Sequence, residues 1–519
     1  MVVGQTDIVS SFLPPFQGYG ILLPIALLLI AAFWALFANL LPGKDRGASL
    51  VGLACSVLAT LCYGFSVPGA LLFGGRYFFT PDARFAAVII CLLAALWCLW
   101  TFGSGQNGGL GRTREAVAFA MLSAIGAVIA VAATDIIVII LALELATMPS
   151  YVLVGYRRYR IKGLEGAMKY FLLSVLTTLI MLYGASFLVG LSASTTFAGL
   201  ASLSNNALTL IAVGMVVLGM FAKMSAAPFH WWAPDAYEGA ESWALSFAAV
   251  VPKVAVTVVL ARLIFIISQP VPQVAEMLMV MAIFSMIVGS FAALMQVNIR
   301  RMMAYSGVSS AGFILLVIAM MAMGLDGSLF ALNAAILYVA AAAFATMGVL
   351  FISAHEGSMV ADLNGLSERR PGAAWALAII AVSMIGVPPT LGFFAKLNVF
   401  LITAAAQQYA LLVFAVVMVV VSAFYYIRLI RASFFGESQK KTTVVTDALD
   451  AEKEGMADSQ NLAAEIEATF TDADIEPATS YPAKTSYSPC AVAAIVLIVV
   501  VLMAAGIFHN PIMTFLAGS

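Results

Sequence analysis

The sequence contains many long runs of apolar residues, and each run is long enough to cross a lipid bilayer as a helix. A spanning helix needs about 20 mostly apolar residues. By this measure the chain has fourteen candidates, which begin near residues 18, 47, 84, 115, 135, 166, 207, 243, 274, 302, 327, 372, 408 and 489. Only 10% of the residues are charged, against about 25% in an ordinary soluble domain. We therefore predict an all-α polytopic membrane protein with about 14 transmembrane helices.

The basic residues between these runs are distributed unequally between alternate connections. Lys and Arg concentrate on the cytoplasmic side of membrane proteins. If the N-terminus is outside, the outer side of the membrane keeps only Arg76, Arg84 and Arg262. The inner connections then hold Lys44, Arg46, Arg112, Arg114, Arg157, Arg158, Arg160, Lys162, Arg300, Arg301, Arg369, Arg370, Arg428 and Arg431. This asymmetry predicts both termini on the outer side and the polar, acidic loop 436–488 on the inner side.

Two stretches far apart in the chain carry nearly the same letters. Leu218–Ser225 reads LGMFAKMS and Leu391–Asn398 reads LGFFAKLN. Five predicted helices lie between equivalent positions, and an odd number inverts the second unit relative to the first. Transporters often contain such inverted repeats. We predict inverted five-helix repeats over helices 4–8 and 9–13, with the chain divided into three N-terminal transmembrane helices (1–114), the first repeat (115–268), the second repeat (269–435), the acidic cytoplasmic loop (436–488) and a C-terminal transmembrane helix (489–519).

Prolines accompany both repeated stretches. Pro228 follows the first one, whereas Pro388 and Pro389 precede the lysine of the second. Proline removes a helical hydrogen bond and frees a carbonyl group, which is tolerated at membrane depth only beside protein or water. Helices 7 and 12 are therefore predicted to be discontinuous.

Three lysines lie well inside predicted spans: Lys223, Lys253 and Lys396. A lysine at the centre of a membrane helix is unfavourable by roughly 2.5–3.5 kcal/mol. Burial disfavours the charged form of lysine and a nearby carboxylate favours it, so a lysine under both influences can take up and release protons. We interpret the three as candidate groups of a proton relay. The alternative is that they form structural ion pairs or extend to the interface.

Two further residues are candidates for proton transfer. Glu144 lies in the middle of the fifth predicted helix and needs a partner, but the sequence does not show which lysine it faces. Asp135, nine residues earlier, is interpreted as a charge at the helix start. His230 follows Pro228 among tryptophans and Tyr237. Since aromatic residues favour membrane interfaces, it is either an interfacial histidine or a secondary candidate for the relay.

Motifs for cofactors and nucleic acid are missing from the sequence. Gly103–Gly108 matches GxGxxG, but it follows a membrane helix and lacks the strand and helix of a dinucleotide-binding unit. The sequence has no P-loop, metal-type cysteine cluster or haem motif, and no basic cluster with interleaved aromatics. We therefore expect no cofactor or metal in this chain and no nucleic-acid partner.

Four stretches together resemble the antiporter-like subunits of respiratory complex I and their relatives among Mrp-type cation/proton antiporters. They are FAKMSAAPFHWWAPDAYEGA, AVVPK ending at Lys253, NIRRMMAYSG and GVPPTLGFFAK. The resemblance extends over about residues 115–435. Within this family the chain looks most like the subunit N group, because VVPK occurs together with both FAK lysines. Where the family often has a histidine, this chain has Ser310.

The resemblance implies a function and a set of partners. Glu144 and Lys223 would form the charged pair of the first half-channel, Lys253 would link the halves, and Lys396 would pass the proton toward the exit. FMN, iron–sulfur clusters and quinone are expected in partner subunits, so this chain would meet quinone only indirectly. The partners would be other membrane subunits, including sibling antiporter-like subunits, in a bacterial-type plasma membrane with both termini periplasmic.

Two other functions remain open from the sequence. An Mrp-type cation/proton antiporter subunit would use the same buried lysines and carboxylate. A scaffold that only holds neighbouring subunits together would not need them, and three lysines inside predicted spans argue against it.

Overall fold

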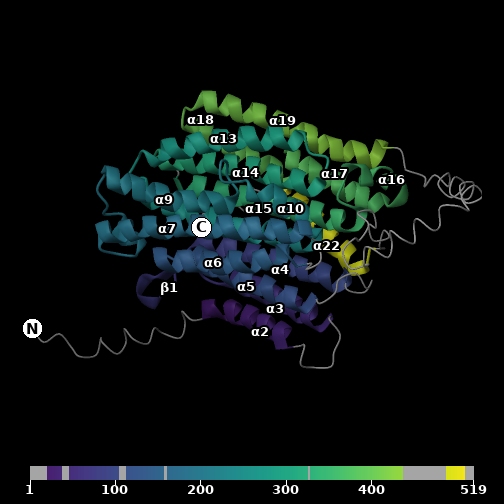
Figure 1. Cartoon of the computed structure of the whole chain (residues 1–519), viewed down its shortest axis with the longest axis horizontal. Coiled ribbons are helices and arrows are strands. Elements are labelled where there is room, and N and C mark those ends of the chain that lie inside the picture. The colour runs from purple at the N-terminus through teal and green to yellow at the C-terminus, as the bar shows by residue number, and fades with distance from the viewer. Residues whose placement is uncertain are drawn as a thin grey trace, which may run out of the picture.

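The structure is a computed structural model, which describes residues 20–37, 46–104, 113–156, 161–324, 328–436 and 487–508. Long helices lie side by side along a common direction, with α2 and α3 at one edge of the bundle and α18 and α19 at the opposite edge (Figure 1). Both chain termini and most of the predicted acidic loop 436–488 lie outside the described residues. The predicted all-α polytopic architecture is confirmed for the described part of the chain.

The N-terminal part contains four helices and the only β-sheet among the described residues. A two-stranded antiparallel hairpin pairs Leu71 with Phe78 and Leu72 with Tyr77. The elements in order are α2 (Leu23–Phe37), α3 (Arg46–Phe65), β1 (Leu71–Leu72), the 3₁₀ helix η3 (Phe73–Gly75), β2 (Tyr77–Phe78), α4 (Pro81–Ser104) and α5 (Thr113–Ala132).

In the next segment, two apolar stretches are each broken into two helices by a short non-helical stretch. The helices are α6 (Ile136–Val154), α7 (Ile161–Ser192), α8 (Phe197–Leu200), α9 (Ala207–Met224), α10 (Trp232–Gly239), α11 (Ser242–Ala248) and α12 (Val251–Ile267). The interruption between α9 and α10 contains Pro228, as expected. A second one separates α11 from α12, which the sequence analysis did not anticipate. Its cause is Pro252, because a proline near a helix start clashes with continuation of the helix from the N-terminal side.

The last segment contains the second expected interruption. Its elements are α13 (Val274–Leu294), α14 (Ile299–Ala322), α15 (Ser328–Glu356), η5 (Val360–Leu363), α16 (Leu366–Arg369), α17 (Pro371–Ile385), α18 (Leu391–Ala405), α19 (Tyr409–Phe435) and α22 (Pro489–Ile507). Within the described residues, 13 helices are long and apolar enough to cross a membrane. The span expected from near residue 372 is instead the shorter pair α17 and α18, with Pro388 and Pro389 between them.

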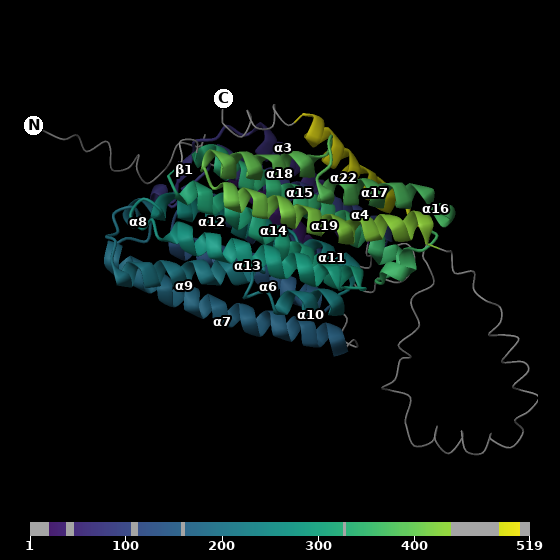
Figure 2. The same cartoon turned by 90° about the horizontal axis from the view of Figure 1, so that it is seen from above.

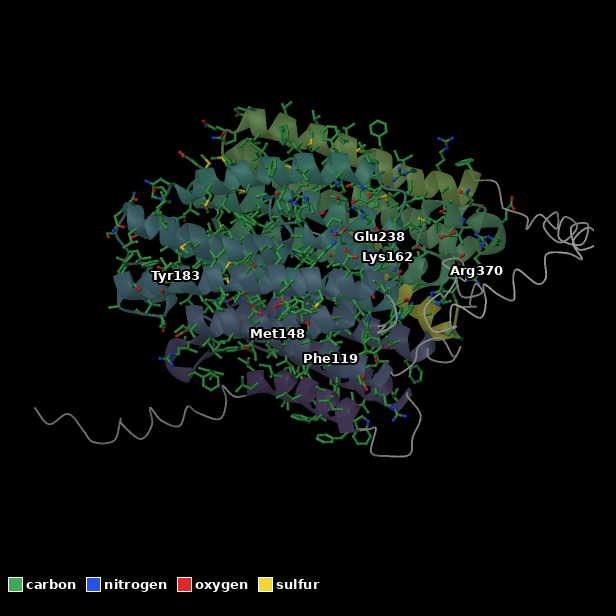
Figure 3. All side chains as sticks on the ribbon, viewed as in Figure 1. Phe119, Met148, Lys162, Tyr183, Glu238 and Arg370 are labelled. Atoms are coloured by element: carbon green, nitrogen blue, oxygen red, sulfur yellow. The ribbon has the colours of Figure 1, made fainter. Side chains whose placement is uncertain are left out.

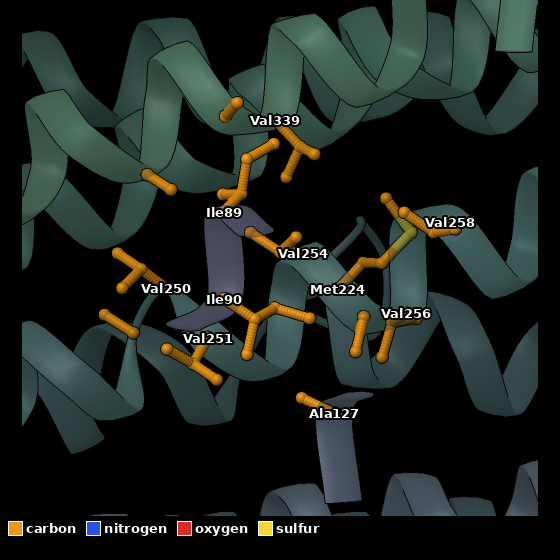
Figure 4. Packing of buried hydrophobic residues seen from close by; sticks show 14 of the residues in the cluster. Ile89, Ile90, Ala127, Met224, Val250, Val251, Val254, Val256, Val258 and Val339 are labelled. Carbon is orange, nitrogen blue, oxygen red and sulfur yellow. The ribbon is translucent and has the colours of Figure 1, made fainter. Parts of the chain in front are cut away.

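The helix α12 lies in the centre of the bundle. Almost every side chain of this helix is buried. Figure 4 shows its valines between Ile89 and Ile90 of α4, Ala127 of α5, Met224 of α9 and Val339 of α15. Because the surroundings are close-packed apolar material, a charged group on α12 needs a partner or a cavity to compensate its charge.

Ion pairs lie at two opposite ends of the bundle. At one end, Glu238 of α10 is 2.7 Å from Arg301 and 4.0 Å from Lys162. Lys162, Glu238 and Arg370 lie toward the same end in Figure 3, whereas Tyr183 is near the other. The arginines assigned to the outer side gather at that other end, in the pairs Arg76–Asp135 and Arg262–Asp82, both 3.5 Å. Among the described residues, basic residues that the sequence assigned to opposite sides thus lie at opposite ends of the bundle.

Asp135 is at the start of α6, as the sequence analysis interpreted it. One of its carboxylate oxygens accepts hydrogen bonds from the backbone N–H groups of Ile137 and Val138, at 3.0 and 3.3 Å. The other accepts a hydrogen bond from the Thr195 hydroxyl at 2.6 Å. Asp135 therefore satisfies two of the free N–H groups that every helix start presents.

Glycines allow α13 and α14 to pack closely. A Cβ atom at Gly289 would lie 2.3 Å from the backbone nitrogen of Ser309, and one at Gly312 would lie 2.8 Å from the carbonyl oxygen of Ala282. In membranes, small residues let helix backbones approach because lipid supplies no hydrophobic drive for association.

We predict that Gly289→Val destabilises the protein by about 1–3 kcal/mol, the usual cost of overpacking. The side chain would have to displace backbone atoms of α14 rather than a flexible side chain. Thermal unfolding of the purified protein measures the effect. Gly214→Val on α9 is the matched control, since a Cβ atom there meets nothing within 4 Å. Equal stability of the two variants would contradict the proposed tight contact.

Candidate functional site

Lys223 and Glu144 form an ion pair in the interior of the bundle. The Lys223 Nζ atom is 2.8 Å from Glu144 Oε1, and the exposed fractions of the two side chains are 1% and 18%. Lys223 is in the last turn of α9 and Glu144 is in the middle of α6. The structure therefore identifies the lysine that Glu144 faces, which the sequence left open.

Hydroxyl groups surround this pair. Thr178 of α7 donates a short hydrogen bond to Glu144 Oε1. Lys223 Nζ is 3.4 Å from the Thr147 hydroxyl and 3.5 Å from that of Ser174, and Tyr151 bonds to both of these hydroxyls. These hydroxyl groups were not among the residues predicted from the sequence. Thr147 and Tyr151 follow Glu144 by one and two helical turns, which places them on the same face of α6, and this spacing was a usable signal.

The chain leaves the helical conformation one residue after Lys223, because α9 ends at Met224. Ser225 adopts a left-handed conformation with φ of 61°, and Pro228 lies in the non-helical segment before α10. The indole N–H of Trp232 donates to the Ala222 carbonyl at 3.0 Å, and the N–H of Ala226 donates to the Phe221 carbonyl at 2.9 Å. Carbonyls freed by the interruption therefore find donors within the protein, as membrane depth requires.

Lys253 has a different environment. It is in the first turn of α12 and lines a cavity of about 40 Å³, measured as the space open to the centre of a water molecule. This is enough for a few waters. Its Nζ atom is 5.4 Å from the centre of the Tyr237 ring. A Cβ atom on Gly307 would come within 2.9 Å of Nζ, so the glycine leaves room for the ammonium group.

Lys396 binds the end of an interrupted helix. Its Nζ atom donates to the carbonyls of Met384 and Ile385, at 2.7 and 2.9 Å. These carbonyls are in the last turn of α17, where the helix dipole concentrates negative partial charge. Gly392 allows the approach of α18, since a Cβ atom there would lie 1.8 Å from the Ser383 carbonyl oxygen.

Lys223 and Lys396 therefore differ in their partners, although the sequences around them are similar. Lys223 pairs with a carboxylate, whereas Lys396 pairs with backbone carbonyls. Among the described residues, no carboxylate forms an ion pair with Lys253 or Lys396. Both lysines instead line cavities, and that of Lys396 measures about 30 Å³ on the same definition.

His230 points into the protein. It is 9% exposed, whereas the neighbouring Trp231 is 73% exposed. The imidazole ring lies 6.2 Å from the ring of Tyr305 on α14, between ring centres. No hydrogen bond or ion pair between described residues joins His230 to any of the three lysines, so it does not belong to a direct chain of contacts with them.

These features together define a class of protein. Buried charged groups beside interrupted helices, near the middle of an all-helical membrane bundle, are the arrangement that ion-coupled transporters use for their binding sites. The chain is thus a polytopic membrane protein of the transporter type.

Comparison with known proteins gives the particular family. A family model described as NADH:quinone oxidoreductase/Mrp antiporter, TM, matches residues 133–422, and this chain belongs to that family. The NADH-quinone oxidoreductase subunit N of Maricaulis maris (strain MCS10) is 36% identical over 366 residues, which cover 68% of this chain and 74% of the relative. The resemblance to the antiporter-like subunits, and to subunit N among them, is confirmed.

Solved structures share the fold over nearly the whole chain. A chain of respiratory complex I from Thermus thermophilus with bound aureothin has a TM-score of 0.75 and 24% identity, with 96% of this chain and 100% of that chain covered. A chain of the Mrp complex from Dietzia sp. DQ12-45-1b has a TM-score of 0.76 and 19% identity, with coverages of 97% and 96%. Since the two scores are nearly equal, the fold does not distinguish the two kinds of complex.

We predict that Glu144→Gln lowers the stability of the protein by roughly 3 kcal/mol, because it leaves the Lys223 ammonium buried without its counter-charge. The double variant Glu144→Gln/Lys223→Met removes both charges and should be more stable than Glu144→Gln alone. Thermal unfolding of the purified complex measures this order. If the double variant is less stable than Glu144→Gln, the charges of Glu144 and Lys223 do not compensate each other as their ion pair indicates.

Proposed function

We propose that this chain is the proton-translocating subunit N-type component of a bacterial NADH–quinone oxidoreductase. In this proposal, electron transfer in partner subunits is coupled to proton movement through buried Lys and Glu residues of this chain. The observation that carries the proposal is the Glu144–Lys223 pair at a helix interruption. The identity to relatives named NADH-quinone oxidoreductase subunit N supports the choice of complex.

The four charged residues have separate roles in this proposal. The carboxylate of Glu144 stabilises the charged form of Lys223, and loss of that contact favours release of the proton. Lys253, in the central cavity, receives a proton from the first half of the protein and passes it to the second. Lys396 holds its proton against the carbonyls at the end of α17 and releases it toward the outer side. His230 is a secondary candidate for transfer beside the first interruption.

The redox chemistry is assigned to partner subunits. The sequence has no motif for a nucleotide, flavin or iron–sulfur cluster, and no group of metal-ligating residues occurs in the described part of the chain. In this proposal, FMN, iron–sulfur clusters and quinone are bound by other subunits. This chain would act beside sibling antiporter-like subunits in the membrane.

The two inverted repeats and the membrane orientation belong to the same proposal. Residues 115–268 and 269–435 would each form one five-helix unit. Each unit has an interruption beside its repeated stretch, after Lys223 in the first and before Lys396 in the second, which supports the assignment. The separation of basic residues between the two ends supports termini on the periplasmic side.

The second candidate function is an Mrp-type cation/proton antiporter subunit. The equal similarity of the fold to an Mrp complex favours it as the alternative. Affinity purification from membranes distinguishes the two. Co-purification with flavin- and iron–sulfur-containing subunits supports the oxidoreductase, whereas recovery with small antiporter subunits alone would contradict it.

We predict that Lys223→Ala abolishes or strongly impairs NADH-driven proton pumping, because it removes the proton-carrying partner of Glu144. Proton uptake into membrane vesicles is the measurement, with the amount of assembled complex determined in parallel. Lys162→Ala is the control, since that side chain is 83% exposed and 4.0 Å from its partner Glu238. Full proton pumping by Lys223→Ala at normal subunit levels would contradict the proposal.

Orientation is testable by thiol labelling with a reagent that does not cross membranes. We expect Val67→Cys to react in intact cells with a permeabilised outer envelope, and Lys162→Cys to react only after the plasma membrane is opened. The unsubstituted chain, which has five cysteines, provides the background. The opposite pattern of reactivity would reverse the assigned orientation.

A further inference from the structure

The cavities around Lys253 and Lys396 share part of their walls. The first is bounded mainly by α12, α14 and α15, and the second by α14, α15, α17, α18 and α19. Two residues line both of them: Ser310 of α14 and Ala342 of α15. The two cavities therefore adjoin at these two residues, and both side chains are small.

Each cavity contains one charged group. Among the described residues, Lys253 is the only charged side chain that lines the first cavity, and Lys396 is the only one that lines the second. No described Asp, Glu or His lines either cavity. A proton that moves between the two lysines through these cavities must therefore travel over water molecules and hydroxyl groups.

The walls have the polar atoms that water needs. A buried water binds two to four polar partners. On the Lys253 side, the Thr257 hydroxyl is fully buried and has no hydrogen-bond partner among protein atoms. On the Lys396 side, the lining residues include Tyr338, Ser383, Ser422 and two more tyrosines, all of which carry hydroxyl groups. The Ser310 hydroxyl is a hydrogen-bond partner of Tyr338.

The neighbouring serine provides a contrast. Ser309 lines only the second cavity, and its hydroxyl forms a hydrogen bond of 2.9 Å with Ser290 of α13. Ser306, one helical turn earlier, bonds to Tyr426 at 2.5 Å. Among the serines of α14, Ser310 is the one that lines both cavities.

We propose that Ser310 is the residue through which protons pass between Lys253 and Lys396, and that Ala342 keeps this passage open. This inference rests on the proposed function. The Lys253 ammonium loses a proton to water in the first cavity, and the Ser310 oxygen accepts a proton from that water. The serine then releases its original proton to water in the second cavity, from which neutral Lys396 takes one. One N–H bond is broken and one is formed, and the serine ends unchanged.

The test uses the purified complex reconstituted in lipid vesicles. Proton uptake per electron is measured together with the rate of quinone reduction, for Ser310→Ala, Ser310→Thr and Ala342→Leu. Ser290→Ala is the matched control, because it removes a buried hydroxyl beside Ser309 but lines neither cavity. Lys396→Ala tests the proposed function itself.

We expect Ser310→Ala to lower the pumping rate roughly two- to tenfold, the factor that corresponds to one lost hydrogen bond. Ala342→Leu, which fills space where the cavities adjoin, should lower it at least as much. Ser310→Thr keeps the hydroxyl and should retain most of the rate, and Ser290→Ala should pump normally. If Ser310→Thr retains the pumping rate while Ser310→Ala loses it, the hydroxyl group of Ser310 is what matters and not the packing of its side chain.

Two results would overturn the inference. If Lys396→Ala abolishes pumping while Ser310→Ala and Ala342→Leu pump normally, the proposed function holds but protons do not pass Ser310. If Lys396→Ala also pumps normally, the proposed function fails, and the role of Ser310 fails with it.

Discussion

The unfavourable free energy of an ammonium group in a membrane interior is the constraint on which the other features of this structure depend. The charge of each lysine is compensated in a different way. Lys223 is compensated by the Glu144 carboxylate, Lys396 by two carbonyls at a helix end, and Lys253 by a cavity large enough for water and by the face of an aromatic ring. Buried charges are retained only when paired, hydrogen-bonded or hydrated. The three lysines therefore differ in the groups that compensate their charge.

The helix interruptions supply part of this compensation. A continuous helix uses its carbonyls internally and offers none to a side chain. The interruption before Pro388 exposes the carbonyls of Met384 and Ile385 to Lys396, and Gly392 lets the next helix approach closely enough for that contact. Pro252 similarly starts α12 at the depth where Lys253 meets its cavity. The prolines and glycines of this chain are thus part of the site as well as of the fold.

Much of the fold was predictable because its determinants are local. A run of about 20 apolar residues specifies a membrane helix whatever surrounds it, and the helix positions follow the apolar runs closely. Pro228, Pro388 and Pro389 indicated two of the interruptions for the same reason. The interruption before α12 was missed although Pro252 is visible in the sequence, because the surrounding residues are apolar enough for one continuous span from Ser242 to Ile267.

The sequence alone determined which residues are charged within the membrane, since apolar context and charge are properties of the chain order. It also determined family membership, through the stretches around Lys223, Lys253 and Lys396. Only the tertiary structure decided that Glu144 faces Lys223, that Lys396 binds a helix end, and that Ser310 lies between two cavities. Those facts depend on the rotation of each helix and on which helices are neighbours. Because nearly every face of these helices is apolar, the periodicity that would reveal such rotations in a soluble protein is absent here.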